Sequence, residues 1–412
     1  MGLIVQKFGG TSVGSVERIL KVAEKIIETK IQGNDVVVVV SAMGKSTDVL
    51  VDLAKQLSDD PPDREMDMLL TTGEQVSIAL LAMALQSKGY PAVSLTGWQA
   101  GIVTESIHTK ARIEQIDNSK IMNHLQKGRI VIVAGFQGVT AHGEITTLGR
   151  GGSDTTAVAL AASLKADLCE IYTDVVGVFS ADPRVVPTAR KLAEISFDEM
   201  LELARLGAGV LHPRAVDCAK KYKVRLTVRS SFTDEEGTTI REETKMEKGS
   251  AVCGVAHNNN VAKITVKNMP NQVHAFSSLL TVLAKSYINV DDIIQSSYES
   301  SLTNISFSLS EDDLKRTLKV LKANKTRLAF EEVIAEVGLA KVSVVGTGML
   351  TNSEGVMSMF KSLASVNIPI KMVSTSEIKV SCIIPADMTE AAVRTLHRAF
   401  RLDVAEIAVI QG

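Results

Sequence analysis

Short apolar runs alternate with longer amphipathic stretches in the first part of the chain, up to about Arg241. The runs are rich in β-branched residues, as in DVVVVVS, which is typical of strands buried on both faces. The pattern predicts strands at Leu3–Lys7, Asp35–Ser41, Ile130–Ala134 and Leu168–Thr173, and helices at Val16–Thr29, Val49–Leu57, Val76–Ser87 and Thr155–Ala166. This alternation predicts a three-layer α/β domain with a mainly parallel sheet, whose ligands bind at the carboxyl ends of the strands.

An internal repeat follows a charged stretch. Arg241–Ser250 (REETKMEKGS) has no apolar face and is predicted to be a linker. Beyond it, Ala262–Val266 resembles Ala340–Val344, and Ile288–Val290 resembles Val366–Ile368 with the same offset of 78 residues. Each copy has the order of a ferredoxin-like βαββαβ unit. We expect a first domain at 1–244, a linker with a possible strand of the second unit at 245–260, and repeat units at 261–338 and 339–412.

Composition excludes several classes of function. The 412 residues are 45% hydrophobic and 22% charged, the balance of a soluble protein of two or three domains. A net charge of −2 and an aromatic content of 4% argue against a nucleic-acid partner. We find no membrane span and no signal peptide. Four widely spaced cysteines favour reduced thiols in the cytoplasm over disulfides or a zinc site: Cys169, Cys218, Cys253 and Cys382.

Glycine-rich segments follow the first two predicted strands. After the first strand, Lys7 begins the segment KFGGTS, whose glycines let backbone N–H groups approach a phosphate while the lysine supplies a compact charge. After the second, Ser41–Thr47 (SAMGKST) offers small hydroxyl side chains. The structural alternatives are a tight turn with a surface lysine and an N-cap for the next helix.

Two further segments place charges near predicted helix starts. Glu74, in TTGEQ, is either a first-turn charge that complements a helix dipole or a carboxylate for a substrate ammonium group. The segment TTLGRGGSDTT holds three glycines, Arg150 and Asp154. Arg150 can bind a carboxylate through two parallel hydrogen bonds, and Asp154 can orient a nucleophile or hold an ammonium group. A merely capped loop would not need so many glycines, so the pattern favours a ligand site.

The strand ending at Thr173 continues into TDVVGVFSADPR. Thr173 and Asp174 suit the ribose or base of a nucleotide, and Arg184 suits its phosphates. An Asx-type turn with a proline stop is the structural alternative.

These motifs, taken together and in this order, resemble those of the aspartate kinases, which belong to the wider amino acid kinase family. GAGVLHPRAV at Gly207–Val216 and VRSS at Val228–Ser231 continue the match, and the repeated units resemble paired ACT domains. The similarity runs over essentially the whole chain and is closest to the short, lysine-responsive bacterial type. It implies transfer of the ATP γ-phosphoryl group to the β-carboxylate of L-aspartate, in the synthesis of lysine, threonine and methionine.

The resemblance also implies roles for individual residues. Lys7 and Asp154 match the catalytic residues, and no protein metal site is implied beyond the Mg²⁺ that accompanies ATP. The implied aspartate site comprises Thr47, Glu74, Arg150, Gly151, Gly152 and Ser153. The implied nucleotide site comprises Lys7, Phe8, Gly9, Gly10, Ser41, Thr173, Asp174, Phe179, Asp182 and Arg184.

Some positions depart from the family pattern. Phe179 stands where many members have tyrosine, and Gly209 where many have lysine, so nucleotide contacts differ. Met269–Val273 lacks the usual Pro-Gly step of the first ACT unit, and Glu354 stands where proline is common in the second. These changes bear on the effector more than on catalysis.

Regulation and rival functions complete the expectations. An end-product amino acid, lysine first, is expected at an interface between regulatory units of two subunits, with Asn289, Asp291, Gln295 and Thr375 as its contacts. A shorter regulatory chain could start at Met246.

The rivals are a kinase acting on glutamate, carbamate or a nucleotide monophosphate, and a non-catalytic amino-acid sensor. The retained Lys7 and Asp154 argue against the sensor.

Overall fold

The computed structural model describes residues 2–207, 209–242, 252–297, 301–347 and 353–403. The chain divides into two compact units, residues 1–179 with 191–248 and residues 180–190 with 249–412. The predicted linker lies mostly outside the described residues, as does Met246.

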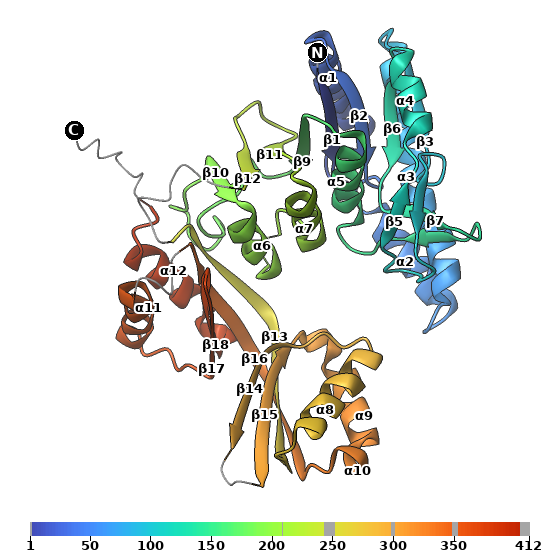
Figure 1. The fold of residues 1–412 in the computed structure, drawn as a ribbon. Coiled ribbons are helices and arrows are strands. Elements are labelled where there is room, and N and C mark those ends of the chain that lie inside the picture. The colour runs from blue at the N-terminus through green and yellow to red at the C-terminus, as the bar shows by residue number, and fades with distance from the viewer. Residues whose placement is uncertain (1, 208, 243–251, 298–300, 348–352, 404–412) are drawn as a thin grey trace, which may run out of the picture. The chain divides into compact units, whose positions relative to one another are not determined.

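The first unit is built on an eight-stranded sheet in the order β10-β12-β11-β9-β1-β2-β6-β3 (Figure 1). Only the β11–β12 pair is antiparallel. The strands of this sheet are β1 (Leu3–Phe8), β2 (Asp35–Val40), β3 (Ala92–Leu95), β6 (Ile130–Ala134), β9 (Leu168–Thr173), β10 (Glu194–Ser196), β11 (Leu226–Ser230) and β12 (Thr238–Arg241). A smaller sheet in the order β5-β4-β7-β8 consists of β4 (Ile102–Thr104), β5 (Ile113–Ile116), β7 (Gln137–Thr140) and β8 (Ile145–Thr147).

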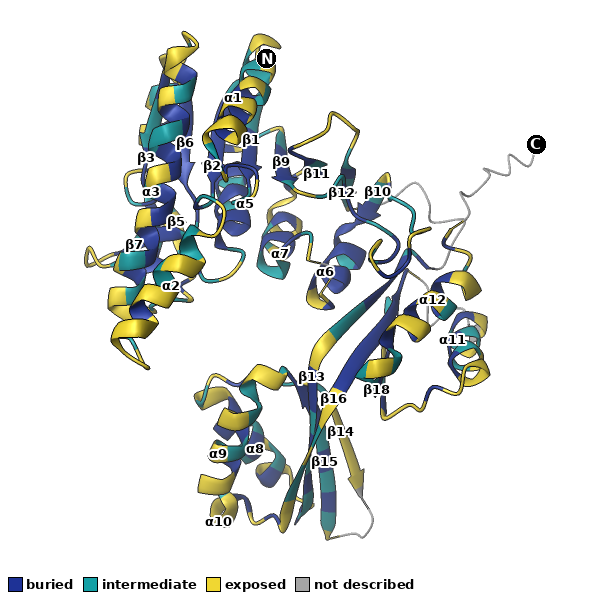
Figure 2. Cartoon of the chain, turned by 180° about the vertical axis from the view of Figure 1, so that it is seen from behind, coloured by how far each residue is buried: buried dark blue, intermediate teal, exposed yellow. Residues whose placement is uncertain are grey.

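Helices cover both faces of the larger sheet. Those of the first unit are α1 (Val16–Ile31), α2 (Ser46–Leu57), α3 (Asp63–Ser87), α4 (Ser119–Gln126), α5 (Gly152–Leu164), α6 (Phe197–Arg205) and α7 (Pro213–Tyr222). Helices α1 and α3 pack with one face of β2, through Ile26, Leu81 and Val38. On the other side, α5 lies against β1, β2 and β9. Buried residues fill the central strands (Figure 2), so the predicted three-layer α/β fold is confirmed.

Helix α3 differs from its prediction. We predicted a helix from Val76, which placed Glu74 just before it, whereas α3 begins at Asp63. The interpretation of Glu74 as a first-turn charge is therefore wrong, because three helical turns precede it. Among the described residues α3 is the one helix long and apolar enough to cross a membrane, but 56% of that stretch is buried. It is the core helix of the first unit.

The second unit contains one antiparallel sheet in the order β14-β15-β13-β16-β18-β17. Its elements are β13 (Gly254–Pro270), α8 (Val273–Lys285), β14 (Asp291–Ser297), β15 (Leu302–Leu309), a 3₁₀ turn (Glu311–Asp313), α9 (Leu314–Ala323), α10 (Lys325–Leu328), β16 (Glu332–Val345), α11 (Ser353–Ser365), β17 (Met372–Ser376), β18 (Lys379–Pro385), a 3₁₀ turn (Ala386–Met388) and α12 (Thr389–Ala399). The predicted βαββαβ repeat is confirmed, with β13 and β16 shared between its copies.

Strand β13 begins inside the segment expected to be a linker. Gly254–Asn258 pairs with β16 in the second copy, and Val261–Lys267 pairs with the earlier part of β16 in the first. The second copy thus takes a strand from the amino-terminal side of the repeat. Residues 404–412, which follow the second copy in the sequence, lie outside those described.

Candidate active site

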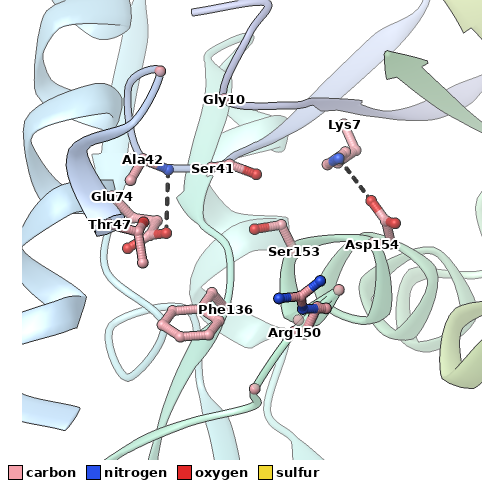
Figure 3. A pocket seen from close by; sticks show the side chains of 14 residues that line it. Lys7, Gly10, Ser41, Ala42, Thr47, Glu74, Phe136, Arg150, Ser153 and Asp154 are labelled. Atoms are coloured by element: carbon pink, nitrogen blue, oxygen red, sulfur yellow. Dashed lines mark hydrogen bonds and ion pairs between the residues drawn. The ribbon is translucent and has the colours of Figure 1, made fainter. Parts of the chain in front are cut away.

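The loops at the carboxyl ends of β1, β2 and β6 line a cavity of about 320 Å³ (Figure 3). Parallel strands end at the same edge of a sheet, which brings loops far apart in sequence together. The cavity is lined by Lys7, Gly10, Ser41, Ala42, Gly44, Thr47, Glu74, Phe136, Gly149, Arg150, Gly151, Gly152, Ser153 and Asp154. All residues predicted for aspartate, and both predicted catalytic residues, are in this set. Of those predicted for the nucleotide, it includes Lys7, Gly10 and Ser41.

Lys7 and Asp154 form an ion pair in this cavity. Lys7 Nζ lies 2.7 Å from Asp154 Oδ1, and each side chain is 11% exposed. Lys7 is the penultimate residue of β1, while Asp154 is in the first turn of α5. Two nearly buried charges need each other, because either one alone would be costly to desolvate. The pair therefore holds the Lys7 ammonium group at the start of α5, where an anion is favoured.

Glu74 is a buried carboxylate with one oxygen unused. Its Oε1 accepts a hydrogen bond of 3.1 Å from the backbone N–H of Ala42. Its Oε2 is buried and has no hydrogen-bond partner among the described residues. Burial raises the pKa of Glu74 to about 7, although backbone hydrogen bonds oppose the shift. A substrate ammonium group would supply both the missing donor and the missing charge.

Arg150 lies on a loop that is held in a special backbone conformation. Gly149 and Gly151 have φ values of +76° and +70°, and a Cβ on Gly151 would lie 2.2 Å from the His212 ring. Only glycine fits there without strain. Arg214 Nη1 donates to the carbonyl of Leu148 at 2.6 Å, which fixes the start of the loop. Arg150 itself is exposed and forms no ion pair among the described residues, so its guanidinium can bind a carboxylate.

Phe136 is a cavity residue that sequence reasoning missed. It has a φ of +69°, a conformation that bulky residues rarely adopt. Its backbone N–H donates to Thr156 Oγ1 at 3.1 Å, and its carbonyl accepts from the N–H of Leu148 at 2.8 Å. Its ring gives the cavity an apolar wall near Arg150 and Glu74 (Figure 3). The sequence around it, AGFQG, gave no signal beyond its two glycines.

Asp67 is a second residue that sequence reasoning missed. This fully buried carboxylate of α3 accepts hydrogen bonds from the Thr109 N–H at 3.0 and 3.1 Å and from Thr147 Oγ1 at 2.6 Å. His108 Nδ1 lies 2.8 Å from Asp67 Oδ2. Asp67 thus ties the helix that carries Glu74 to Thr147, just before the Arg150 loop. The sequence signal available for Asp67 was its spacing. It lies two helical turns before Glu74, so both acids are on the same face of the helix, which is otherwise apolar.

Comparisons with known proteins assign the chain to a family. The amino acid kinase family matches residues 2–230, and an ACT domain matches residues 342–400. The chain is 62% identical to the aspartokinase of Bacillus sp. (strain MGA3) over 402 residues, which covers 98% of each. It therefore belongs to the amino acid kinase family, among the aspartokinases.

Two solved structures extend the likeness to three dimensions. One is E. coli aspartokinase III in complex with aspartate and ADP, with 25% identity, a TM-score of 0.84 and coverage of 96% of this chain and 99% of that chain. The other is the same enzyme in complex with lysine and aspartate, with 26% identity, a TM-score of 0.73 and coverage of 97% and 99%. The predicted aspartate kinase resemblance is confirmed.

The remaining nucleotide candidates of this aspartokinase lie outside the cavity lining. The Phe8 ring is fully buried and stacks on Tyr172 with centroids 4.7 Å apart, so only its backbone can meet a ligand. The Gly9 N–H donates to the carbonyl of Tyr172 at 3.2 Å. Thr173 and Asp174 follow at the carboxyl end of β9, and Thr173 Oγ1 donates to Asp174 Oδ1 at 3.1 Å.

Phe179, Asp182 and Arg184 are divided between the two units of the aspartokinase. Half-buried Phe179 belongs to the first unit, where it forms a bridge with Lys191. Asp182 and Arg184 lie in the segment 180–190, which belongs to the second. They pair with each other at 2.7 Å, and the hydrogen bonds from Arg184 lower the pKa of Asp182.

The effector candidates lie on two strands of the regulatory sheet. Asn289 precedes β14, which carries Asp291 and Gln295, whereas Thr375 is on β17. These strands form opposite edges of the sheet, so one chain does not bring the four residues together. Gln295 Nε2 donates to Asn271 Oδ1 at 3.2 Å, and Asp291 pairs with Lys341.

Proposed function

We propose that this protein transfers the γ-phosphoryl group of ATP to the β-carboxylate of L-aspartate, giving 4-phospho-L-aspartate. The observation that carries the proposal is the buried Oε2 of Glu74, which lies in the same cavity as Arg150 and the Lys7–Asp154 pair. Neither Glu74 Oε2 nor the Arg150 guanidinium has a polar partner among the described residues. An anion for an ammonium group, a cation for a carboxylate and a cation for a phosphate are what the two substrates require. The E. coli relative that binds aspartate and ADP supports the same pairing of substrates.

In this proposal the amino-acid substrate spans the cavity. Glu74 receives its ammonium group and Arg150 one of its carboxylates, while Thr47, Ser153 and the amides of Gly151 and Gly152 complete the contacts. The Phe136 ring lies against the methylene carbon. Glu74 and Arg150 would select the amino acid whose charged ends match their separation, and the proposal assigns that length to aspartate.

Phosphoryl transfer then depends on alignment and charge. A carboxylate is already a nucleophile at neutral pH, so no strong general base is required. Lys7 neutralises charge that builds on the transferring phosphoryl group, and Asp154 holds Lys7 in place before the nucleotide arrives. Within the first unit the proposed nucleotide site comprises Phe8, Gly9, Gly10, Ser41, Thr173, Asp174 and Phe179. The assignment of Asp182 and Arg184, which belong to the second unit, stays a prediction from the sequence.

Mg²⁺ accompanies the nucleotide in this proposal. No group of three or more His, Cys, Asp or Glu side chains in the described parts of the chain is placed to hold a metal. Mg²⁺ is commonly held by substrate phosphates, water and one or two carboxylates. Asp174, exposed at the end of β9, is one carboxylate of the proposed nucleotide site that would be accessible to such an ion. The ion would shield the negative charge of the phosphates.

The decisive assay supplies ATP with a panel of amino acids, carbamate and nucleotide monophosphates, follows ADP release, and uses hydroxylamine to trap any acyl phosphate. We expect a hydroxamate with aspartate only. Product with glutamate, with carbamate or with a nucleotide monophosphate would support another member of the family. No turnover, with retained binding of an amino acid, would support a sensor.

We also propose feedback inhibition by lysine, an end product of the pathway that 4-phosphoaspartate enters together with threonine and methionine. The E. coli relative forms a complex with lysine and aspartate. Here Asn289, Asp291 and Gln295 lie at one sheet edge and Thr375 at the other, so pairing of edges from two subunits would unite them. A homo-oligomer through the ACT units follows from this arrangement.

The regulation is tested by Asp291→Ala, which we expect to raise the inhibitory lysine concentration. Deletion from Val261 onward should abolish inhibition. If changes at Asp291, Gln295 and Thr375 all leave inhibition as in the parent, the effector site lies elsewhere. We also propose a cytoplasmic location and a separate, shorter regulatory chain that starts at Met246. A mass spectrum of the natively expressed protein tests the internal start.

A further inference from the structure

A buried lysine lies in the middle of the regulatory sheet. Lys341, on β16, pairs through its backbone with Asn258 on β13 and Ile383 on β18, and its side chain is only 4% exposed. A buried ammonium group needs a counter-charge. Two aspartates of the edge strand β14 supply it, since Lys341 Nζ lies 2.5 Å from Asp291 Oδ2 and also pairs with Asp292.

A β-bulge lets two consecutive aspartates reach one ammonium group. In a regular strand their side chains would point to opposite faces of the sheet. On β14, however, Asp291 pairs with Ser308 and Ile293 with the adjacent Phe307, so Asp292 is an extra residue with a φ of +23°. The bulge redirects its carboxylate to the same side as that of Asp291.

The two carboxylates differ in their surroundings. The Asp292 side chain is 8% exposed, whereas that of Asp291 is 63% exposed. Asp292 and Lys341 therefore make a complete buried pair of opposite charges. Asp291 is a second, solvent-accessible carboxylate, on which the Lys379 ammonium group also acts.

Both partners of the accessible pair are ionised. Burial by itself lowers the pKa of Lys341, but the two aspartates outweigh it and raise the pKa above its ordinary value. Burial raises the pKa of Asp291, but Lys341 outweighs it and the pKa falls. The Asp291 carboxylate is thus charged at neutral pH and shared with an internal cation.

We propose that Lys341 competes with the ammonium group of the effector for Asp291, and that Asp292 makes the exchange possible. This inference rests on the proposed role of Asp291 in effector binding. When the effector pairs with Asp291, Lys341 keeps Asp292 and no buried charge is left alone. The exchange releases a link between β14, in the first ACT copy, and β16, which is shared with the second. Lys341 therefore sets the effector concentration at which the enzyme responds.

The first test replaces Lys341, which competes with the effector, together with its buried partner Asp292. In the double variant Lys341→Met and Asp292→Leu, apolar side chains replace the buried pair and Asp291 remains without a rival. We expect the lysine concentration for half-inhibition, and the lysine Kd from calorimetric titration of the full-length protein, to fall about two- to fivefold, the range for a partly exposed ion pair. Inhibition is normalised to the uninhibited rate of each variant.

The matched control is the double variant Lys263→Met and Glu336→Leu. These residues form a 2.8 Å ion pair on the same sheet, between β13 and β16, without involving Asp291. The lysine Kd of this control variant should equal that of the parent protein. A similar fall in the control would overturn the inference, because any loss of charge from the sheet would then have the same effect.

A second variant keeps the positive charge at position 341. Lys341→Arg offers a planar fork that can bind both carboxylates, so it should hold Asp291 more firmly and raise the lysine Kd. The inference fails if neither Lys341 variant shifts the lysine Kd while Asp291→Asn raises it. If Asp291→Asn binds lysine like the parent, the proposed effector site is wrong instead.

Discussion

The Lys7 ammonium group lies 2.7 Å from a carboxylate oxygen of Asp154, at the point where the end of β1 meets the start of α5. Because both side chains are nearly buried, neither is stable there as an isolated charge. The pair keeps a positive charge in the cavity before any nucleotide binds. A phosphate group that enters can then share Lys7 with Asp154.

Lys7→Ala should lower kcat by a factor on the order of 10² or more, because a charge aimed at the transferring phosphoryl group acts mainly in the transition state. Steady-state kinetics at saturating ATP and aspartate measure this. Lys45→Ala is the matched control, since Lys45 is exposed on the neighbouring glycine loop and should change kcat little. An unchanged kcat in a folded Lys7→Ala protein would rule out the assignment.

Arg150→Ala should weaken aspartate binding and leave ATP binding nearly intact. Loss of a charge-assisted partner costs roughly 1.5–3 kcal/mol, which corresponds to about a ten- to hundredfold rise in the aspartate Kd. Calorimetric titration of each substrate is the measurement. Arg112→Ala serves as the control, because the Arg112 side chain is 80% exposed and lies outside the cavity lining. A large loss of ATP affinity alone would mean that the two pockets are interchanged.

Glu74→Gln should weaken aspartate binding yet stabilise the ligand-free protein above neutral pH. Burial raises the folded-state pKa of Glu74 from 4.5 to about 7, so the protonated acid is favoured in the folded protein. The resulting contribution of Glu74 to the stability of the parent protein is fully present below pH 4.5 and is lost as the pH rises through 7. Between pH 4.5 and 8 the difference in unfolding free energy between Glu74→Gln and the parent should shift by about 3 kcal/mol in favour of the variant.

Chemical denaturation of parent and Glu74→Gln at several pH values checks this prediction. Saturating aspartate should reverse the difference, because the substrate ammonium group stabilises the ionised carboxylate of the parent only. An identical pH dependence of both proteins without ligand would contradict the raised pKa.

Asp67→Asn should raise the KM for aspartate about tenfold while kcat and the KM for ATP change little. An asparagine cannot accept every hydrogen bond that Thr109, Thr147 and His108 direct at the carboxylate, so the Arg150 loop loses its position relative to Glu74. Asp63→Asn, an exposed change on the same helix, is the control. A fall in kcat with both KM values unchanged would instead indicate simple loss of folded enzyme.

Local sequence determined the strands and the position of the glycine loops. A run such as DVVVVV can satisfy its backbone and bury its side chains only as a central strand, and β2 has those bounds. The glycines around Arg150 predicted a ligand site, and Gly149 and Gly151 have positive φ values in that loop. The 78-residue repeat likewise appeared in the sequence alone, because each copy needs the same buried positions.

Tertiary structure alone decided which distant residues support those motifs. The start of α3 at Asp63 was missed because Asp67, Thr71 and Glu74 interrupt the apolar positions of its buried face, so the helical spacing does not appear as hydrophobic periodicity. Hydrogen bonds from Thr109 and Thr147 to Asp67 stabilise this stretch. The φ of Phe136 depends on hydrogen bonds to Thr156 and Leu148. Asp291 appeared as a free loop carboxylate in the sequence, yet Lys341, 50 residues away, pairs with it. Each of these contacts spans a separation at which local patterns carry no information, because desolvation and hydrogen bonding act between residues that only the fold brings together.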